Sequence, residues 1–297
     1  MSRQIQKVAV IGLGRMGSTI ARRILGAGFD TTVYNRTAAK MDPLVQKGAK
    51  GAPSPREAAA GADAVVTCLM GDASVFDVVL GEDGLLAGLT RGAVHIGTTT
   101  VSPRCSTQLA ELHASRGSRY LAAPIIGRPD MAEIGRVMAF VAGDYQAMRR
   151  CVRLFKSYAS GITNVGKDHA VANSAQLVFT YMTVSLIEMI GDVYAFGERS
   201  GINGAVLNGL VSAMLGPPAL KDYAHRIHAR DFDDVSYDLL SGLRDVQLIL
   251  QAADETRVPL SYACIIRERF LAAAANGLGD KDWCAITEIT RMNAGLN

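Results

Sequence analysis

The sequence has few cysteines and no close pair of them. Its five cysteines are widely spaced, odd in number and without a C-x-x-C motif, at Cys68, Cys105, Cys151, Cys264 and Cys284. A disulfide framework or a thiolate metal site needs paired or closely spaced cysteines. We therefore expect reduced thiols, no bound metal and a cytoplasmic location.

A strong charge of either sign is also missing. The chain carries 31 lysines and arginines against 28 acidic residues, a net charge of +3, and its arginines are scattered. So small a charge gives no electrostatic basis for binding nucleic acid. The chain shows no charged-then-apolar targeting segment at its start, and we expect no apolar run of membrane-spanning length. The expected partner is a small-molecule substrate, with neither nucleic acid nor membrane.

The sequence does contain a glycine-rich turn in an informative context. Apolar residues 8–11 predict a strand, residues 16–27 a helix, and residues 31–34 a second strand. The turn between strand and helix reads G-x-G-x-x-G, the order of a dinucleotide-binding βαβ unit. The helix N-terminus would receive the pyrophosphate. The predicted cofactor contacts here are Gly12, Leu13, Gly14, Arg15, Met16 and Gly17. The alternative is a glycine turn in some other α/β fold.

The end of the second strand indicates which dinucleotide binds. An NAD site usually has an acidic residue there, bonded to the ribose 2′-hydroxyl. This chain has Asn35, Arg36 and Thr37, followed by Lys40. Asparagine does not repel a 2′-phosphate, and Arg36 can form charge-assisted bonds to one. We therefore favour NADP over NAD. In the alternative, Arg36 stacks on adenine or points to solvent.

Strand and helix patterns alternate through the first half of the chain. Further strands are predicted at residues 63–69, 93–97, 120–123 and 137–142, with a helix starting near Ser102 and Pro103. Repeated strand–helix units imply a parallel sheet with helices on both faces. We expect a Rossmann-type, doubly wound, NADP-binding domain over residues 1–165.

The pattern changes after Asp168. Residues 168–200 form one helical run, interrupted only by glycines, whose apolar residues cover more than one face. We expect this helix to be buried nearly all round. Helical segments follow, with breaks at 216–218, 230–231 and 258–259. The prediction is an all-α substrate and dimerisation domain over residues 166–297, and a homodimer whose subunits share the long helix.

Several motifs together resemble one enzyme family. The chain is similar to the β-hydroxyacid dehydrogenases, such as 3-hydroxyisobutyrate dehydrogenase, and to the imine reductases of the same fold. The matching segments are residues 12–17 with 35–37, 97–103, 122–129, 244–245 and 277–283. The resemblance covers nearly the whole chain and implies an NAD(P)-dependent oxidoreductase related to 6-phosphogluconate dehydrogenase.

The resemblance also shows where this chain departs from the family. Relatives carry a catalytic lysine early in the long helix, an asparagine four residues later and a carboxylate sixteen residues after the lysine. Asp192 fits the carboxylate, which puts Gln176 in the lysine's place and Thr180 in the asparagine's. Tyr181, one residue on, either points a hydroxyl at the substrate or packs in the core. The predicted catalytic residues are Gln176, Thr180 and Tyr181.

The segment similar to the family's substrate loop departs as well. Ala122 replaces an acid, Ile126 replaces a serine, and Arg244 stands where a lysine is usual. These changes argue against a hydroxy-acid substrate. The residues expected beside the nicotinamide are Leu69, Met70, Thr98 and Thr99. Those expected beside the substrate are Thr100, Pro124, Ile125, Ile126, Gly127 and Arg244.

Loss of the lysine bears on the reaction. An amide such as that of Gln176 donates a hydrogen bond but delivers no proton at neutral pH. An iminium substrate is already cationic, and a lysine ammonium beside it would be repulsive. The sequence therefore favours NADPH-dependent reduction of a C=N bond. Reduction of a small aldehyde or ketone, or oxidation of a 3-hydroxy acid, is the first alternative, and a non-catalytic NADP-binding scaffold is the second.

Overall fold

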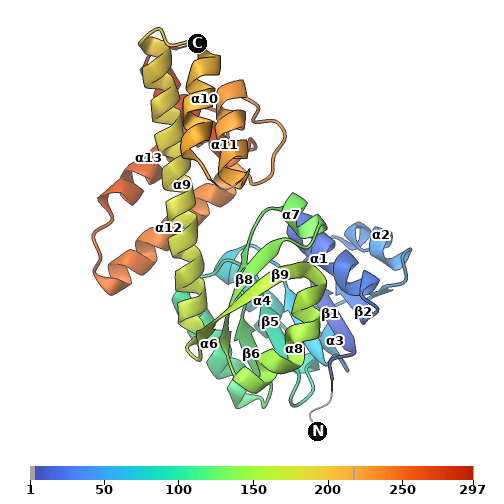
Figure 1. Ribbon diagram of the computed structural model, residues 1–297. Coiled ribbons are helices and arrows are strands. Elements are labelled where there is room, and N and C mark those ends of the chain that lie inside the picture. The colour runs from blue at the N-terminus through green and yellow to red at the C-terminus, as the bar shows by residue number, and fades with distance from the viewer. Residues whose placement is uncertain (1–3, 217, 297) are drawn as a thin grey trace. The chain divides into compact units, whose positions relative to one another are not determined.

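The computed structural model describes residues 4–216 and 218–296 (Figure 1). The chain divides into two compact units, Met1–Gln176 and Leu177–Asn297. The sequence placed the division at residue 165, before the long helix. The difference arises because the first turns of that helix pack on the first unit. Ala172 lies in a core cluster of this unit, and Asn173 accepts a hydrogen bond from the Ser106 hydroxyl.

The first unit is built on a nine-stranded sheet. Its strands run in the order β3-β2-β1-β4-β5-β6-β8-β7, with β9 paired to β8. Their bounds are β1 Lys7–Ile11, β2 Asp30–Tyr34, β3 Lys50–Gly51, β4 Ala64–Thr67, β5 Val94–Gly97, β6 Arg119–Ala122, β7 Ile125–Ile126, β8 Val137–Gly143 and β9 Ala159–Gly166. Strands β1 to β6 are parallel, which confirms the predicted doubly wound core.

Two features of the sheet differ from the prediction. Strand β8 runs antiparallel to both β6 and β7, because β7 and β8 are joined only by the short helix α7 (Pro129–Glu133) and cannot cross over. Strands β3, β7 and β9 were not predicted: β3 and β7 have only two residues each, and the glycines, serine and asparagine of β9 favour turns. The sheet is therefore mixed at this edge and parallel elsewhere.

Helices cover both faces of the sheet because apolar side chains alternate along each strand. On β1, Val8 and Val10 belong to one core cluster, and Ala9 and Ile11 to the other. The first cluster also takes residues from α1 (Arg15–Gly26) and α8 (Tyr145–Tyr158). The second takes residues from α3 (Pro55–Ala59), α4 (Gly71–Leu80), α5 (Leu85–Gly88) and α6 (Pro103–Ser115). Two short helices, η1 (Ala38–Lys40) and α2 (Asp42–Val45), follow β2.

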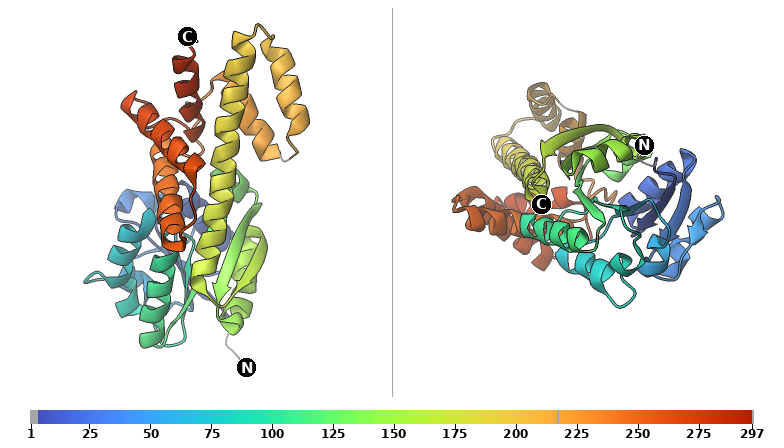
Figure 2. Two further views of the ribbon diagram at one scale, coloured as in Figure 1. Left: turned by 90° about the vertical axis from the view of Figure 1, so that its left-hand side faces the viewer. Right: turned by 90° about the horizontal axis from the view of Figure 1, so that it is seen from below.

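The second unit is helical. Its elements are α9 (His169–Arg199, shared with the first unit), α10 (Gly204–Met214), α11 (Pro218–Ala229), α12 (Leu239–Thr256), α13 (Ser261–Ala275), η2 (Trp283–Thr287) and α14 (Glu288–Asn293). Figure 2 shows α10 returning beside the end of α9. The glycines of α9 permit close packing, since a Cβ at Gly191 would meet Thr287 and one at Gly197 would meet Leu207. The break predicted at 216–218 includes Pro217, which lies outside the described residues.

The expectation that α9 is buried nearly all round is wrong. A stripe of apolar side chains along it is exposed in the single chain, at Val178, Met182, Met189, Val193 and Phe196. Their spacing follows the helical period, so they form one face. The remaining faces carry core residues of the second unit. By length and composition alone α9 could also cross a membrane, with half of its most apolar window buried, contrary to the expectation that no apolar run reaches that length.

Candidate functional site

The glycine turn between β1 and α1 forms an open cradle. Gly12 has a φ of +94°, and a Cβ there would overlap with the carbonyl oxygen of Cys68. A Cβ on Gly17 would overlap with the carbonyl oxygen of Gly12, whereas nothing lies within 4 Å of one on Gly14. Helix α1 begins at Arg15, after the N-cap residue Gly14, which has no side chain to cap it. These residues fit a dinucleotide pyrophosphate, because the glycines let the ligand approach the backbone closely and a helix N-terminus attracts an anion.

Two of the residues predicted to contact the cofactor in this turn have side chains that pack in the core instead. Leu13 and Met16 pack in the core cluster beneath α1. The backbone N–H of Leu13 donates to Asn35 Oδ1 over 2.9 Å, and Asn35 Nδ2 donates to the carbonyl oxygen of Thr37 over 3.0 Å. Asn35 therefore ties the end of β2 to the glycine turn.

Positive charge at the end of β2 comes from its neighbours. Arg36, Thr37 and Lys40 are all exposed. The two basic residues, Arg36 and Lys40, follow Asn35 within five positions of the chain. Arg15, at the start of α1, is exposed too. This arrangement can neutralise an anionic group on the ribose, and no acidic residue of the chain occupies positions 35–40 to oppose it.

Two further loops follow the carboxyl ends of the adjacent strands β4 and β5. The N–H of Leu69 donates to Thr99 Oγ1 over 2.9 Å, and Thr98 Oγ1 donates to the carbonyl oxygen of Thr67 over 2.7 Å. Both threonines are buried, whereas Met70 is 62% exposed and Thr100 is half-buried. Because β1, β4 and β5 are neighbours in the sheet, their three loops lie at one edge, where parallel sheets bind ligands.

Asp72, which the sequence analysis did not identify, fixes the loop after β5 by bonding Ser102. Its carboxylate accepts from the Ser102 N–H over 2.8 Å and from the Ser102 hydroxyl over 2.5 Å. The Ser102 hydroxyl in turn accepts from the Cys105 N–H at the start of α6. The sequence indicated the N-terminal cap of α6 through Ser102 and Pro103. It did not indicate that Asp72 bonds Ser102, because the two residues are thirty positions apart.

The segment predicted to contact substrate lies at the sheet edge. Pro124 is buried, and Ile125 and Ile126 form the short strand β7. Gly127 follows with a φ of +137°, and a Cβ there would lie 2.8 Å from Val137 Cγ1. The apolar side chains of Ile125 and Ile126 are half-buried, so this segment offers no polar group of its own beyond its backbone.

The predicted catalytic residues lie along α9. Gln176 is the last residue of the first unit and only 5% exposed, and Thr180 is likewise buried. Tyr181 packs partly buried against two core clusters of the second unit. One turn before Gln176, Asn173 accepts from Ser106, and Ser106 also bonds the Tyr120 hydroxyl. A buried polar cluster that the sequence did not predict thus supports the start of α9.

In the second unit, Arg244 belongs to a cluster with Tyr237 and Asp245. Arg244 Nη2 donates to Asp245 Oδ1 over 3.1 Å, and the Tyr237 hydroxyl donates to Asp245 Oδ2 over 2.6 Å. Burial raises the pKa of Asp245, although Arg244 and Tyr237 oppose this shift. The sequence identified Arg244, but Tyr237 went unnoticed because an aromatic residue there reads as core.

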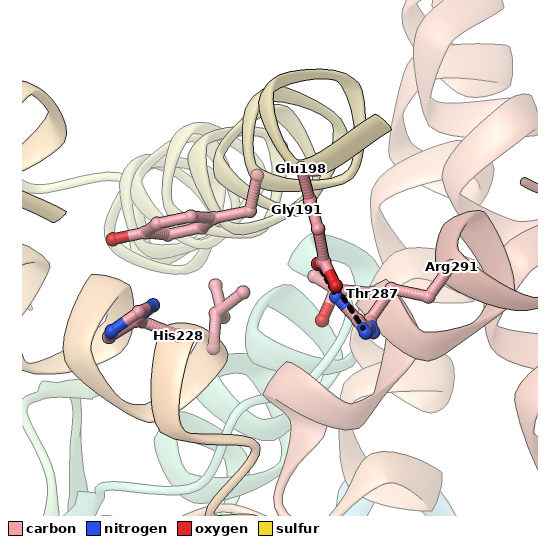
Figure 3. Close-up of a pocket in the computed structure, with 7 residues that line it drawn as sticks. Gly191, Glu198, His228, Thr287 and Arg291 are labelled. Carbon is pink, nitrogen blue, oxygen red and sulfur yellow. Dashed lines mark hydrogen bonds and ion pairs between the residues drawn. The ribbon is translucent and has the colours of Figure 1, made fainter. Parts of the chain in front are cut away.

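A cavity of about 290 Å³ lies within the second unit, next to a pocket of about 30 Å³ that shares several of its residues and is drawn in Figure 3. Its lining includes Tyr194, Glu198, His228 and Arg291, with Glu198 and Arg291 forming an ion pair. The Tyr194 and His228 rings are stacked with centroids 5.6 Å apart. No residue predicted for catalysis or binding lines this cavity. Among residues 4–216 and 218–296, no group of three or more His, Cys, Asp or Glu side chains could hold a metal.

The glycine turn, the start of α1 and the loops at one sheet edge define a dinucleotide-binding site. A family model for the NAD binding domain of 6-phosphogluconate dehydrogenase matches residues 7–166. The chain belongs to this family and is an NAD(P)-dependent oxidoreductase, which confirms the cofactor class and the reaction class that the resemblance implies.

Two curated relatives extend over nearly the whole chain. The uncharacterized oxidoreductase YfjR of Bacillus subtilis is 38% identical over 280 residues, covering 94% of this chain and 98% of the relative. Glyoxylate/succinic semialdehyde reductase 1 of Arabidopsis thaliana is 26% identical over 290 residues, covering 97% of this chain and 99% of the relative.

Solved structures share the fold. The 3-hydroxyisobutyrate dehydrogenase (ygbJ) of Salmonella typhimurium has a TM-score of 0.86 at 23% identity, covering 96% of this chain and 99% of that one. The imine reductase of Myxococcus stipitatus, solved with NADP+, has a TM-score of 0.65 at 21% identity, covering 95% of this chain and 99% of that one. At these identities the likeness establishes the fold alone.

Proposed function

We propose that the protein is an NADPH-dependent reductase that transfers hydride to a C=N bond. The observation that carries this proposal is the buried amide of Gln176, at the helical position where the family resemblance places a lysine. A neutral amide holds and orients a substrate nitrogen by hydrogen bonding but supplies no proton at neutral pH. An iminium needs none from the protein, since hydride addition neutralises it.

The preference for NADP is part of the same proposal. Arg36 and Lys40 follow β2 and are exposed, and the Asn35 side chain bonds backbone atoms of Leu13 and Thr37. Bound NADPH would supply the hydride. The residues of this chain would hold it through the glycine turn and helix N-terminus of residues 12–17 and through the basic groups after β2.

Positioning of the reacting carbon is assigned to the loops after β4 and β5. Thr98 and Thr99 bond to the backbone around Thr67 and Leu69, which fixes the two loops against each other. A rigid loop edge raises the rate by holding the two reacting centres close and excluding water. We assign the predicted contacts of Thr100, Ile125, Ile126 and Gly127 to the substrate side of this edge.

The test is NADPH consumption with 2-methyl-1-pyrroline, cyclopentanone and succinic semialdehyde as substrates. Turnover of the imine alone, little changed in Gln176→Lys, would support C=N reduction. Turnover of the ketone or semialdehyde, improved or shifted in pH optimum by Gln176→Lys, would overturn it in favour of carbonyl reduction. Tight NADPH binding with no turnover across the panel would instead support a scaffold role.

Carbonyl reduction is the second candidate. It is favoured by the relative named a glyoxylate/succinic semialdehyde reductase, which matches nearly the full length of this chain. An alkoxide formed from such a substrate needs a proton or an oxyanion partner. Gln176 would stabilise it only by hydrogen bonding, so the rate should be slower than with lysine.

We also propose that the protein is a cytoplasmic homodimer. The exposed stripe of α9 supports the dimer, because a contiguous apolar face of this kind suits a second copy of the same helix. Sedimentation should give twice the monomer mass, and Phe196→Glu should reduce it to the monomer. A monomeric wild type would contradict the dimer.

The cytoplasmic location is supported by the five free cysteines, which suit a reducing compartment. Oxidised cysteines in protein isolated under thiol-blocking conditions would contradict this location.

A further inference from the structure

The loop after β4 and the loop after β5 are bonded to each other close to their strands. The N–H and the hydroxyl of Thr98 both donate to the carbonyl oxygen of Thr67, over 3.0 and 2.7 Å. Further along the two loops, the Leu69 N–H donates to Thr99 Oγ1 over 2.9 Å. These contacts join neutral groups, and all of them lie within the first unit.

At the helix ends of the same two loops, the contact is made by the carboxylate of Asp72. Asp72 lies in the first turn of α4, and Ser102 is the N-cap residue of α6. The carboxylate accepts from the Ser102 N–H over 2.8 Å and from the Ser102 hydroxyl over 2.5 Å. That hydroxyl also accepts from the Cys105 N–H over 3.1 Å, so Asp72 links the first turn of α4 to the cap of α6. Hydrogen bonds to a carboxylate are about twice as strong as those between neutral groups.

The bonded residues of the two loops are buried, and the residues between them are more accessible. Thr98, Thr99 and Ser102 are at most 6% exposed. Met70 is 62% exposed and Thr100 is half-buried. The bonds therefore set the shape of the loops, while Met70 and Thr100 stay within reach of a ligand.

We propose that Asp72 is a positioning residue: by bonding Ser102, it holds the loops after β4 and β5 in the arrangement that receives the nicotinamide half of NADPH. This inference rests on the proposed function, in which these loops position the reacting carbon. Loops that are already ordered lose little entropy when a ligand binds, whereas ordering mobile loops reduces the affinity. The adenosine half is assigned to other residues, the basic groups after β2, and does not depend on Asp72.

The test compares NADPH with a ligand that shares only its adenosine half. Adenosine 2′,5′-bisphosphate carries the 2′-phosphate but lacks the nicotinamide, its ribose and one phosphate of the pyrophosphate. We expect Asp72→Ala to weaken NADPH binding about tenfold, the size of a lost charge-assisted contact, and to change bisphosphate binding less than about twofold. Calorimetric titration measures both affinities. An equal loss for both ligands, or an unchanged affinity for NADPH, would overturn the proposal.

The fluorescence of bound NADPH reports whether the nicotinamide itself is held. A reduced nicotinamide that is ordered and shielded from water emits more strongly and at shorter wavelength than the free cofactor. With each protein saturated with NADPH, Asp72→Ala should shift the emission of the bound cofactor toward that of free NADPH. A lower melting temperature with wild-type emission would show that Asp72 is merely structural, and the proposal would fail.

The matched control is Asp77→Ala, which removes an exposed carboxylate from the same helix. This variant should change neither the NADPH affinity nor the emission. The same losses in Asp77→Ala would mean that the charge of α4 matters and the bond to Ser102 does not. Asp72→Asn keeps the shape of the side chain and an acceptor for the Ser102 N–H, so it serves if Asp72→Ala does not fold. We expect it to weaken NADPH binding about threefold, again without affecting the bisphosphate.

A double variant tests whether Asp72 acts through Ser102. Ser102→Ala removes the hydroxyl that donates to the carboxylate. Added to Asp72→Ala, this change should weaken NADPH binding by less than about twofold more, because the two residues act through one contact. Fully additive losses would overturn the proposal.

These binding measurements keep the inference distinct from the proposed function, because they need no turnover. If no imine is reduced, the proposed reaction fails while the role of Asp72 stands. If Asp72→Ala weakens NADPH and the bisphosphate equally, the positioning role fails while the reaction stands.

Discussion

His95 and His113 are hydrogen-bonded to each other in the interior of the first unit, with His95 Nδ1 and His113 Nε2 2.9 Å apart. The outer nitrogens bond Thr67 and Ser118 over 2.9 and 2.8 Å, and neither ring is exposed. In such a pair one facing nitrogen donates to the other, and burial favours the neutral form of both rings. Burial lowers the pKa of His113 to about 4 and that of His95 well below 6.5; His169 adds to the effect on His113, and His113 adds to the effect on His95.

We predict that this pair makes the protein less stable in mild acid. Between the ordinary pKa of 6.5 and about 4, unfolded histidine binds a proton that folded His113 does not, so the free energy of unfolding falls as pH drops. The loss from His113 alone reaches about 3 kcal/mol. Urea unfolding at pH 7.5 and 4.5 measures it. His113→Gln should flatten this dependence, while the exposed His225→Gln should keep it; an unchanged slope in His113→Gln would count against the assignment.

Glu188 should have the opposite dependence on pH. Burial raises its pKa to about 7, Arg269 at 3.7 Å lowers it, and Asp192 adds to the increase. The folded state therefore binds a proton that the unfolded state releases above 4.5, and stability is lost as pH rises through 7. We expect Glu188→Gln to remove a loss of up to about 3 kcal/mol between pH 5 and 8.5. Equal slopes in urea titrations of wild type and variant would refute this.

The glycines of the first turn should separate folding from cofactor binding. Gly17→Ala places a methyl group against the Gly12 carbonyl oxygen and should cost at least about 2 kcal/mol of stability. Gly14→Ala meets nothing in the protein, so its melting temperature should match the wild type while NADPH binding weakens about tenfold or more. Thermal melts and fluorescence titrations with NADPH distinguish the two. Wild-type affinity in Gly14→Ala would remove this residue from the cofactor site.

Arg36 should account for the choice between the two dinucleotides. We expect Arg36→Ala to weaken NADPH binding about tenfold to a hundredfold and NADH binding about twofold or less, because only NADPH carries the 2′-phosphate. Fluorescence titration with each cofactor provides the measurement. Arg116→Ala, which removes an exposed arginine at the C-terminal end of α6, is the matched control and should change neither. An equal loss of affinity for NADPH and NADH in Arg36→Ala would contradict the NADP assignment.

The sequence by itself determined the parts of this protein that depend on neighbouring residues. The alternation of Val8 and Val10 with Ala9 and Ile11 encodes a strand buried on both faces. The spacing of Gly12, Gly14 and Gly17 encodes the turn, because a Cβ on Gly17 would overlap with the nearby Gly12 carbonyl oxygen and Gly14 leaves open space at the start of α1. The length of α9 was readable for the same reason, because helical periodicity repeats within a few residues.

Only the tertiary structure decided what depends on residues distant in the chain. Asp72 and Ser102 are thirty residues apart, and no short-range pattern reports their bond. The same holds for the His95 and His113 pair, whose side chains meet only because β5 and α6 pack together. The exposed stripe of α9 was misjudged because apolar composition measures a tendency to be buried, while burial itself depends on which neighbours the fold supplies.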